Sequence, residues 1–332
     1  MTVYNRAMRV LFLSRFFWPH IGGVERHVEA VGRELTKLGH KITVITLKHE
    51  AKLPETQTYR DLKIVRLPYS NSKWGIWRAL WQKRQILKSA DIIHCHDVFF
   101  WYLPFRFFWI NKPVFTTFHG WEGVYPIPKR NILIRKLSER LSFGSIAIGS
   151  FMKRWYGQKP DYISYGGVTL LCSDRSIKML SGNPKEIIFI GRLDQDNAIE
   201  EYLAALKAIK EKFKLPVTFV GDGGWRGKAE KLGKVTGMVK DLTPYLKRPA
   251  YIFATSYLTI WEALAYNRPV FSLYQNQLKK DYLEKFPAAG SINISGSAEE
   301  LVGQLKEPKK IKVILPTWKQ VAQTYLKLWQ KR

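Results

Sequence analysis

Short apolar runs alternate with amphipathic stretches along most of the chain. The first run, residues 10–13, is followed by a glycine-containing loop and then by apolar residues spaced three and four positions apart, ending at Gly39. That spacing keeps side chains on one face of a helix, and glycine commonly ends a helix. A second apolar run follows at residues 41–47. The first 47 residues therefore predict a strand, a helix and a second strand in a βαβ unit.

The alternation continues through two blocks of sequence. Short apolar strands separated by helices favour a parallel sheet that is covered on both faces. The length of 332 residues also favours two domains over one. We therefore predict an α/β protein with two facing Rossmann-like domains, at residues 1–168 and 187–314, joined by a polar linker at 169–186. Further strands are expected at residues 62–67, 91–94, 114–118, 145–148, 162–165, 187–190, 217–220, 251–254 and 270–273, and further helices at 198–213 and 258–266.

An aromatic stripe marks the end of the chain. Trp318, Val321, Tyr325 and Trp329 fall on one side of a predicted helix. Such a stripe needs a partner surface, either on another domain or in a local core. We assign residues 315–332 to a helix that packs back on the first domain.

The charge of the chain is strongly positive. Lys and Arg number 54 against 27 Asp and Glu, which gives a formal net charge of +27. Such an excess predicts an anionic partner, which could be nucleic acid, an anionic membrane or a phosphorylated substrate. The basic residues accompany no RNA-binding motif and are not gathered into a tail, so we expect no nucleic-acid partner. Apolar residues make up 46%, which excludes a mainly disordered chain.

The cysteines and the N-terminus bear on the compartment. Cys95 and Cys172 cannot form a disulfide framework, which favours a reducing environment. The first residues lack the long apolar core and the cleavage site of a secretory signal. Residues 98–110, the most apolar stretch, are too few to span a bilayer. A cytoplasmic protein is therefore expected.

Candidate ligand-binding residues lie where predicted strands of the first domain end. Gly22 and Gly23 precede the first helix, where backbone amides could bind an anion or simply form a tight turn. His119 follows the strand at 114–118, at the sheet edge where open α/β folds bind ligands. His94 and His96 suggest a metal site or a core position, and we favour the core, so no metal site is expected.

The second domain offers similar positions. Arg192 follows the strand at 187–190, and its forked guanidinium suits a phosphate, although a surface ion pair would also fit. Gly221 and Gly223 follow the strand at 217–220 and form either a plain turn or a flat surface for a ligand. Glu262 lies in an apolar helix and needs a hydrogen-bonding partner, which could be a sugar hydroxyl or a buried basic side chain.

Six short motifs follow one another along nearly the whole chain. They are Gly22-Gly23-Val24-Glu25, Phe118-His119-Gly120, Tyr165-Gly166-Gly167-Val168, Gly191-Arg192-Leu193, Val220-Gly221-Asp222-Gly223 and Trp261-Glu262-Ala263-Leu264-Ala265. In this order they resemble the motifs of the GT-B glycosyltransferases, specifically glycosyltransferase family 4. The resemblance implies a retaining, metal-independent hexosyltransferase without a cofactor, whose co-substrate is a nucleotide-diphosphate sugar. It also implies that the tail helix crosses back to the first domain.

The same resemblance assigns roles to individual residues. Arg192 would bind the donor diphosphate and stabilise it as it leaves, and Glu262 would bind the ribose hydroxyls. His119 would lie beside the reacting centre. The amides of Leu258 and Thr259 would contact the phosphate or the sugar. The remaining donor-binding positions would be Gly22, Gly23, Gly221 and Gly223.

Two positions depart from the family pattern. Family members usually carry a lysine where this chain has Asn197, and a glutamate where it has Ala254. The lysine places positive charge on the leaving diphosphate, where electrostatic stabilisation matters most. Lys279 and Lys280 could supply that charge instead. Otherwise the chain could be a nucleotide-sugar-binding pseudoenzyme or an epimerase of the same fold.

A basic and aromatic segment in the first domain indicates where the acceptor lies. Tryptophans recur at helical spacing between residues 73 and 88, with basic residues beside them, as in helices that lie in an anionic membrane interface. A second aromatic group follows at residues 101–109. The alternative is that these aromatics belong to the core. We expect peripheral attachment to the inner face of the cell membrane and a lipid-linked or cell-envelope glycan acceptor. The predicted interface residues are Trp74, Trp77, Arg78, Trp81, Lys83 and Arg84.

Overall fold

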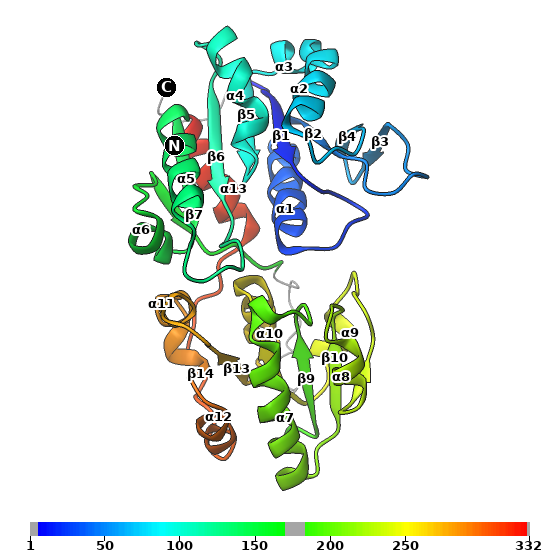
Figure 1. Cartoon of the computed structure of the whole chain (residues 1–332), viewed down its shortest axis with the longest axis vertical. Helices are drawn as coiled ribbons and strands as arrows, with labels where there is room; N and C mark the ends of the chain where they lie inside the picture. Colours follow the sequence, from blue (N-terminus) through cyan, green and yellow to red (C-terminus); the bar gives the residue numbers. More distant parts are fainter. Residues whose placement is uncertain (1–5, 170–182, 331–332) are drawn as a thin grey trace.

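The computed structural model describes residues 6–169 and 183–330, and these form two α/β units arranged end to end (Figure 1). In the first unit the strands follow the order β3-β4-β2-β1-β5-β6-β7-β8, and all pairs are parallel except β3 with β4. Its strands are β1 (Arg9–Ser14), β2 (Lys41–Leu47), β3 (Thr56–Tyr59), β4 (Leu62–Leu67), β5 (Ile92–His96), β6 (Val114–Phe118), β7 (Gly144–Ile148) and β8 (Tyr162–Ser164). Its helices are α1 (Gly23–Lys37), α2 (Lys73–Gln82), α3 (Arg84–Ser89), α4 (Phe99–Phe108), α5 (Lys129–Leu141) and α6 (Phe151–Tyr156).

The second unit contains a parallel sheet in the order β11-β10-β9-β12-β13-β14. Its strands are β9 (Glu186–Ile190), β10 (Val217–Val220), β11 (Lys234–Val235), β12 (Ala250–Ala254), β13 (Val270–Leu273) and β14 (Asn293–Ser295). Its helical segments are η2 (Gln195–Asn197), α7 (Ile199–Phe213), α8 (Arg226–Glu230), α9 (Thr243–Leu246), α10 (Tyr257–Ala265), α11 (Gln277–Glu284), η3 (Ala289–Ser291) and α12 (Ala298–Gln304). The last helix of the chain is α13 (Trp318–Trp329).

The central strands of each sheet are apolar because helices cover both faces. In the first sheet Val10 on β1 pairs with Ile42 on one side and Ile92 on the other, and all three are buried. In the second sheet Ile188 of β9 lies between β10 and β12 in the same way. This arrangement confirms the predicted pair of parallel, Rossmann-like domains.

The last helix, α13, belongs structurally to the first domain (Figure 1). Its apolar face joins the core formed by α1 and the first sheet, and Trp329 Nε1 donates a hydrogen bond to Nδ1 of His94 over 3.0 Å. The bridge between Val168 and Thr317 marks where the chain returns to the first domain. The crossing predicted for the tail is therefore confirmed, and the local-core alternative is wrong.

The predicted linker at 169–186 is only partly seen. Residues 170–182 of it lie outside the described residues, whereas Glu186 is already the first residue of β9. The last residue of the predicted linker, Glu186, is thus part of a strand. Within the described residues, no helix is both long enough and apolar enough to cross a lipid bilayer.

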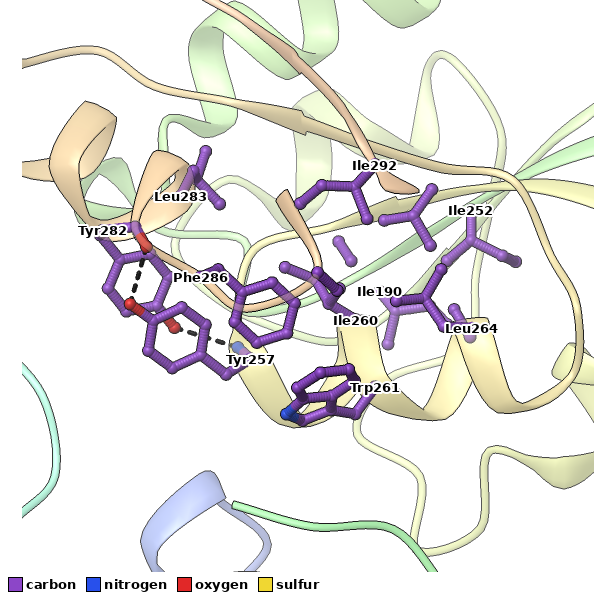
Figure 2. Packing of buried hydrophobic residues seen from close by; sticks show 14 of the residues in the cluster. Ile190, Ile252, Tyr257, Ile260, Trp261, Leu264, Tyr282, Leu283, Phe286 and Ile292 are labelled. Carbon is purple, nitrogen blue, oxygen red and sulfur yellow. Dashed lines mark hydrogen bonds between the residues drawn. The ribbon is translucent and has the colours of Figure 1, made fainter. Parts of the chain in front are cut away.

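The core of the second domain holds α10 and α11 together (Figure 2). The rings of Tyr257 on α10 and Tyr282 on α11 are stacked, with centroids 3.8 Å apart and planes 1° from parallel. The hydroxyl of each tyrosine bonds to the backbone of the other, at 3.0 and 2.7 Å. Trp261 and Phe286 pack beside this pair. These contacts join the first turn of α10 to the last turn of α11.

Candidate functional site

A cavity of about 750 Å³ lies where the two domains meet. The carboxyl ends of parallel strands point toward it, as expected for ligand sites in open α/β sheets. The first domain contributes residues after β6 and from α1, α4 and α5, and the second contributes the start of α10. Its inner wall includes His27, His119, Gly120, Trp121, Ser256, Tyr257, Leu258 and Tyr282.

His119 lies in this wall, directly after β6. Its backbone N–H donates to the carboxylate of Asp97 at 3.0 Å, and its ring Nε2 lies 2.9 Å from Nδ1 of His96. Burial, with nearby histidines, lowers the pKa of the His119 ring well below its usual range. The imidazole is therefore neutral at physiological pH, so it can form hydrogen bonds but provides no fixed positive charge.

A buried polar network lies beneath His119. His94 Nε2 and Thr117 Oγ1 are 2.7 Å apart, and the hydroxyl of Tyr325 on α13 bonds to both Thr117 and His27, each at 2.9 Å. His94 and His96 are buried, as a core position requires. Among residues 6–169 and 183–330, no group of three or more His, Cys, Asp or Glu side chains is placed to hold a metal ion. These histidines are therefore buried, hydrogen-bonded residues of the core beside the cavity.

The two glycines before α1 differ in their surroundings. Gly22 is the N-cap of α1 in extended backbone, and a Cβ at this position would collide with the carboxylate of Glu25. Gly23 lines the cavity, and a Cβ there would meet no atom within 4 Å. Only Gly23 is therefore open to a ligand in this conformation.

Arg192 follows β9 and is 56% exposed. Its guanidinium is paired with Asp194 at 3.4 Å and, more closely, with Asp196. Asp196 in turn lies against Gly123 of the first domain, where a Cβ would come within 2.9 Å of the Asp196 Cβ. The surface ion pair that the sequence allowed is thus present, and it holds Arg192 beside the domain boundary.

Gly221 and Gly223 pack against the loop that carries Arg192. A Cβ on Gly221 would overlap the carbonyl of Gly191, and one on Gly223 would lie 2.6 Å from Asp194 Oδ1. Asp194 Oδ1 also accepts a hydrogen bond from the Gly224 amide at 2.9 Å. The structure therefore explains these glycines by close loop packing, and their donor-binding role stays a prediction.

Glu262 on α10 forms an ion pair with Arg26 of α1. Its Oε1 accepts from the guanidinium, whereas Oε2 is buried and has no hydrogen-bond partner among the described residues. Both side chains line a second cavity of about 480 Å³ between the domains, with Lys240, Thr243 and Trp318. A basic partner for Glu262 is thus present, although Arg26 is half-buried rather than buried. One carboxylate oxygen still needs a donor such as a hydroxyl.

Leu258 and Thr259 occupy the first turn of α10. Leu258 lines both cavities, and the Thr259 hydroxyl lies 3.1 Å from that of Ser256, the N-cap. Amides in a first turn have no acceptor inside their own helix. They can therefore donate to an anion at the cavity, as the family resemblance implies.

The predicted interface segment is partly exposed. On α2, Trp74 is 77% exposed and Trp81 is 48% exposed, while Ile76 and Leu80 are buried on the opposite face. Trp77 is half-buried and donates to the carbonyl of Phe100 over 2.9 Å. Trp74 and Trp81 are thus available at the surface, whereas Trp77 helps attach α2 to α4.

The basic residues of this segment also differ from one another. Arg78 is exposed, Arg84 lies over the ring of Trp81, and Lys83 forms an ion pair with Glu55. In the second aromatic group, Trp101 and Phe105 are core residues. Phe107 and Phe108 at the end of α4 are about 70% exposed. The expected second patch is therefore limited to the end of α4.

Sequence reasoning missed the residues that join the two domains. Arg26 pairs with Glu262, and Trp121 lies beside Lys279, so each contacts a residue more than 100 positions away in the sequence. Tyr282 lines the same cavity as His119, which is also more than 100 positions away. Arg26 follows the glycine motif and could have been noted as a basic residue in the first turn of α1. Nothing in the local pattern around Trp121 or Tyr282 indicates their role.

Comparison with known proteins is consistent with this geometry. The sequence model of Glycosyltransferase Family 4 matches residues 21–160. An uncharacterised glycosyltransferase of Methanocaldococcus jannaschii is 23% identical over 68% of this chain and 66% of its own length. The phosphatidyl-myo-inositol mannosyltransferase of Mycolicibacterium smegmatis is 23% identical over 71% of this chain and 64% of its own. The chain thus spans slightly less than two thirds of these relatives.

Solved structures show the same architecture. The sucrose-phosphate synthase of Thermosynechococcus elongatus superposes with a TM-score of 0.72 at 16% identity, covering 98% of both chains. Anabaena HepE in complex with UDP and glucose gives a TM-score of 0.68 at 15% identity, again over 98% of both. The structural matches show the GT-B fold. The family model, which matches most of the first domain, supports the resemblance to glycosyltransferase family 4 that the ordered motifs carry.

Proposed function

We propose that this protein transfers a sugar from a nucleotide-diphosphate sugar to a lipid-linked or cell-envelope glycan acceptor at a membrane surface. The donor would bind to the second domain, between Arg192 and the first turn of α10. The acceptor would approach from the first domain. A glycosyltransferase relative that acts on phosphatidyl-myo-inositol, by its name, supports the lipid-linked acceptor, and a structural neighbour with bound UDP supports the donor.

The cavity beside His119 carries this proposal. Away from His119 it is lined by apolar side chains of α4 and α5, including Phe100, Leu103, Ile134 and Leu137. Ile134 and Leu137 are themselves exposed, so the apolar wall continues to the surface of the first domain. Lys73 and Arg130 stand at its rim. An apolar wall with basic residues at its edge suits a lipid that carries a phosphate.

The reaction that we propose is electrostatic. The bond from the anomeric carbon to the diphosphate breaks, and a bond to the acceptor oxygen forms on the same face, so the configuration is retained. The acceptor proton passes to an oxygen of the leaving phosphate. Arg192 and the amides of Leu258 and Thr259 would stabilise the charge of the leaving group, so that this reaction requires no metal ion.

A ligand screen followed by a transfer assay tests this function. We expect one class among UDP-, GDP- and ADP-sugars to raise the melting temperature, because a ligand that binds only the folded state stabilises it. That donor should then give a product with a polyprenyl-diphosphate-linked sugar and with anionic vesicles present. Binding without transfer or hydrolysis would favour the pseudoenzyme, and sugar isomerisation without an acceptor would favour an epimerase. Retention of random RNA in a gel at physiological salt would favour a nucleic-acid partner.

Membrane attachment gives a separate prediction. The exposed aromatics Trp74, Trp81, Phe107 and Phe108 lie on α2 and α4, which Figure 1 places at the end of the first domain away from the second. We expect Phe107→Ser with Phe108→Ser to weaken binding to phosphatidylglycerol vesicles, measured by co-sedimentation, by about 100-fold or more, because each aromatic ring removed from the interface forfeits roughly 1.5 kcal/mol or more. Binding should also fall with salt.

A matched control for the vesicle experiment lies in the second domain. Ile314 is 93% exposed and far from α2 and α4 in the chain. Ile314→Ser should leave vesicle binding within twofold of the wild type. Equal losses in the control and in the double variant, or equal binding of wild type to neutral and anionic vesicles, would contradict attachment through this face.

A further inference from the structure

The family position for a lysine near the donor diphosphate is Asn197 in this chain, yet another lysine lies close to the same place. Asn197 ends the short η2 helix, and its side-chain amide donates to the carbonyl of Arg192 over 3.4 Å. An amide carries no net charge, so the leaving group would lack one cation. We propose that Lys279, in the first turn of α11, supplies this charge to the donor diphosphate; the inference rests on the proposed function.

Lys279 is held between the two domains. Its Nζ lies 5.6 Å from the ring centre of Trp121 in the first domain and 4.9 Å from that of Tyr282 on its own helix. Both rings line the cavity that contains His119 and the start of α10. The quadrupoles of aromatic rings attract a cation that lies between them. This attraction fixes the position of the ammonium but does not neutralise its charge.

The surroundings of Lys279 lack a dedicated counter-ion. The residue is only 8% exposed, and among the described residues no carboxylate lies within ion-pair distance of its ammonium. Burial lowers its pKa to about 8, a shift that Arg192 increases and Asp196 opposes. A buried ammonium without a partner is costly, and it is satisfied once an anion enters.

The loop before α11 lies against the short helix that carries Asn197, because the side-chain amide of Gln275 donates to the carbonyl of Gln195 over 3.0 Å. Lys279 is therefore near Arg192 and its ion-pair partner Asp196, and Asp196 is the acidic group that raises the pKa of Lys279. The stacked pair of Tyr257 and Tyr282 ties the helix of Lys279 to the first turn of α10 (Figure 2). A diphosphate at that turn would thus meet donors from α10 and two cations, from the β9 loop and from α11.

The neighbouring Lys280 provides a matched comparison. Its ammonium lies 3.8 Å from Glu284 on the same helix, its side chain is more exposed, and its ring contact is with Tyr274. It shares the sequence environment of Lys279 and already has an acidic partner. Of the two lysines that the sequence offers, the structure therefore assigns the role to Lys279.

Substitution at these positions tests the inference in two assays. The first is calorimetric titration of full-length protein with UDP, GDP and ADP, which needs no acceptor. Lys279→Gln should weaken the nucleotide that the wild type binds by about 10-fold, while Lys280→Gln changes the affinity by less than twofold. The second is transfer, in which Lys279→Gln should lower kcat by 10- to 100-fold, Lys279→Arg by less, and Asn197→Lys in the Lys279→Gln background should restore at least threefold. The melting temperature of Lys279→Gln should not fall, because the change removes a desolvated charge.

Each result separates the inference from the function on which it rests. A Lys279→Gln protein that binds the nucleotide and turns over as the wild type does would overturn the role of Lys279 and leave the proposed function standing. Equal losses in the Lys279→Gln and Lys280→Gln proteins would do the same, since a general effect of helix charge would then explain both. A wild-type protein that binds none of the three nucleotides would overturn both proposals.

Discussion

Replacement of Arg192 by alanine should lower kcat for sugar transfer by about 100- to 1,000-fold, the range expected when one preorganised donor to a developing negative charge is lost. Arg192 lies at the carboxyl end of β9, and its present partners are carboxylates of its own loop, Asp194 and Asp196. A diphosphate would compete for the same guanidinium. The loss should appear in kcat more than in donor affinity, because the leaving group gains charge as the bond breaks.

Arg248 gives the matched control for Arg192. Its side chain has similar exposure and forms one ion pair, with Glu186 at 2.9 Å. Glu186 is the first residue of β9, whereas Arg192 follows the last residue of that strand. Arg248→Ala therefore removes an equivalent ion pair from the opposite end of the same strand. Both variants should unfold within about 1 kcal/mol of the wild type, because exposed ion pairs contribute little. Transfer by Arg192→Ala at the rate of Arg248→Ala would refute the assigned role.

The strands that the sequence predicts are those with continuous apolar runs. Central strands such as β1 and β9 are buried on both faces, so every position favours an apolar residue. Three short strands were not predicted: β3, β11 and β14, with the sequences TQTY, KV and NIS. All three lie at or near sheet edges, where one partner strand suffices and polar residues are tolerated. Their pairing depends on the neighbouring strand, which local patterns do not encode.

The candidate site was predictable only to the level of single strands and helices. His119, Arg192 and Glu262 could be identified because strand ends and an unusual carboxylate in an apolar helix are local features. Their partners could not be identified in this way. The pair between Arg26 and Glu262 and the contact between Lys279 and Trp121 join different domains, so they depend on how the domains face each other.

Acidification should destabilise this protein strongly through its buried histidines. His27, His94 and His96 are almost fully buried beneath the cavity, and burial is the main cause that lowers the pKa of each. For His27 the pKa falls to about 3. In the unfolded chain the same rings take up protons near pH 6.5. The folded state therefore keeps its full stability above pH 6.5 and loses it as the pH falls toward the lowered values.

The size of this effect follows from proton linkage. A histidine whose pKa is about 3 in the folded state, as for His27, should remove about 2 kcal/mol from the free energy of unfolding between pH 7 and pH 5. His94 and His96 act in the same direction, because burial lowers their pKa values too. Even 2 kcal/mol is a considerable part of the total stability of an ordinary domain, about 5–15 kcal/mol. Urea unfolding at pH 7, 6 and 5 measures it directly.

Two substitutions in the polar network distinguish titration from loss of packing. His27→Gln keeps a polar group beside the Tyr325 hydroxyl but removes one titrating ring, so the loss of stability between pH 7 and 5 should shrink by about 2 kcal/mol. Thr117→Val removes hydrogen bonds from the same network without removing a titrating group. It should lower stability at every pH and leave the pH-dependent loss as in the wild type. If His27→Gln also leaves that loss unchanged, the ring of His27 takes up its proton in the folded state as it does in the unfolded chain. The prediction that this ring stays neutral in the folded protein would then be wrong.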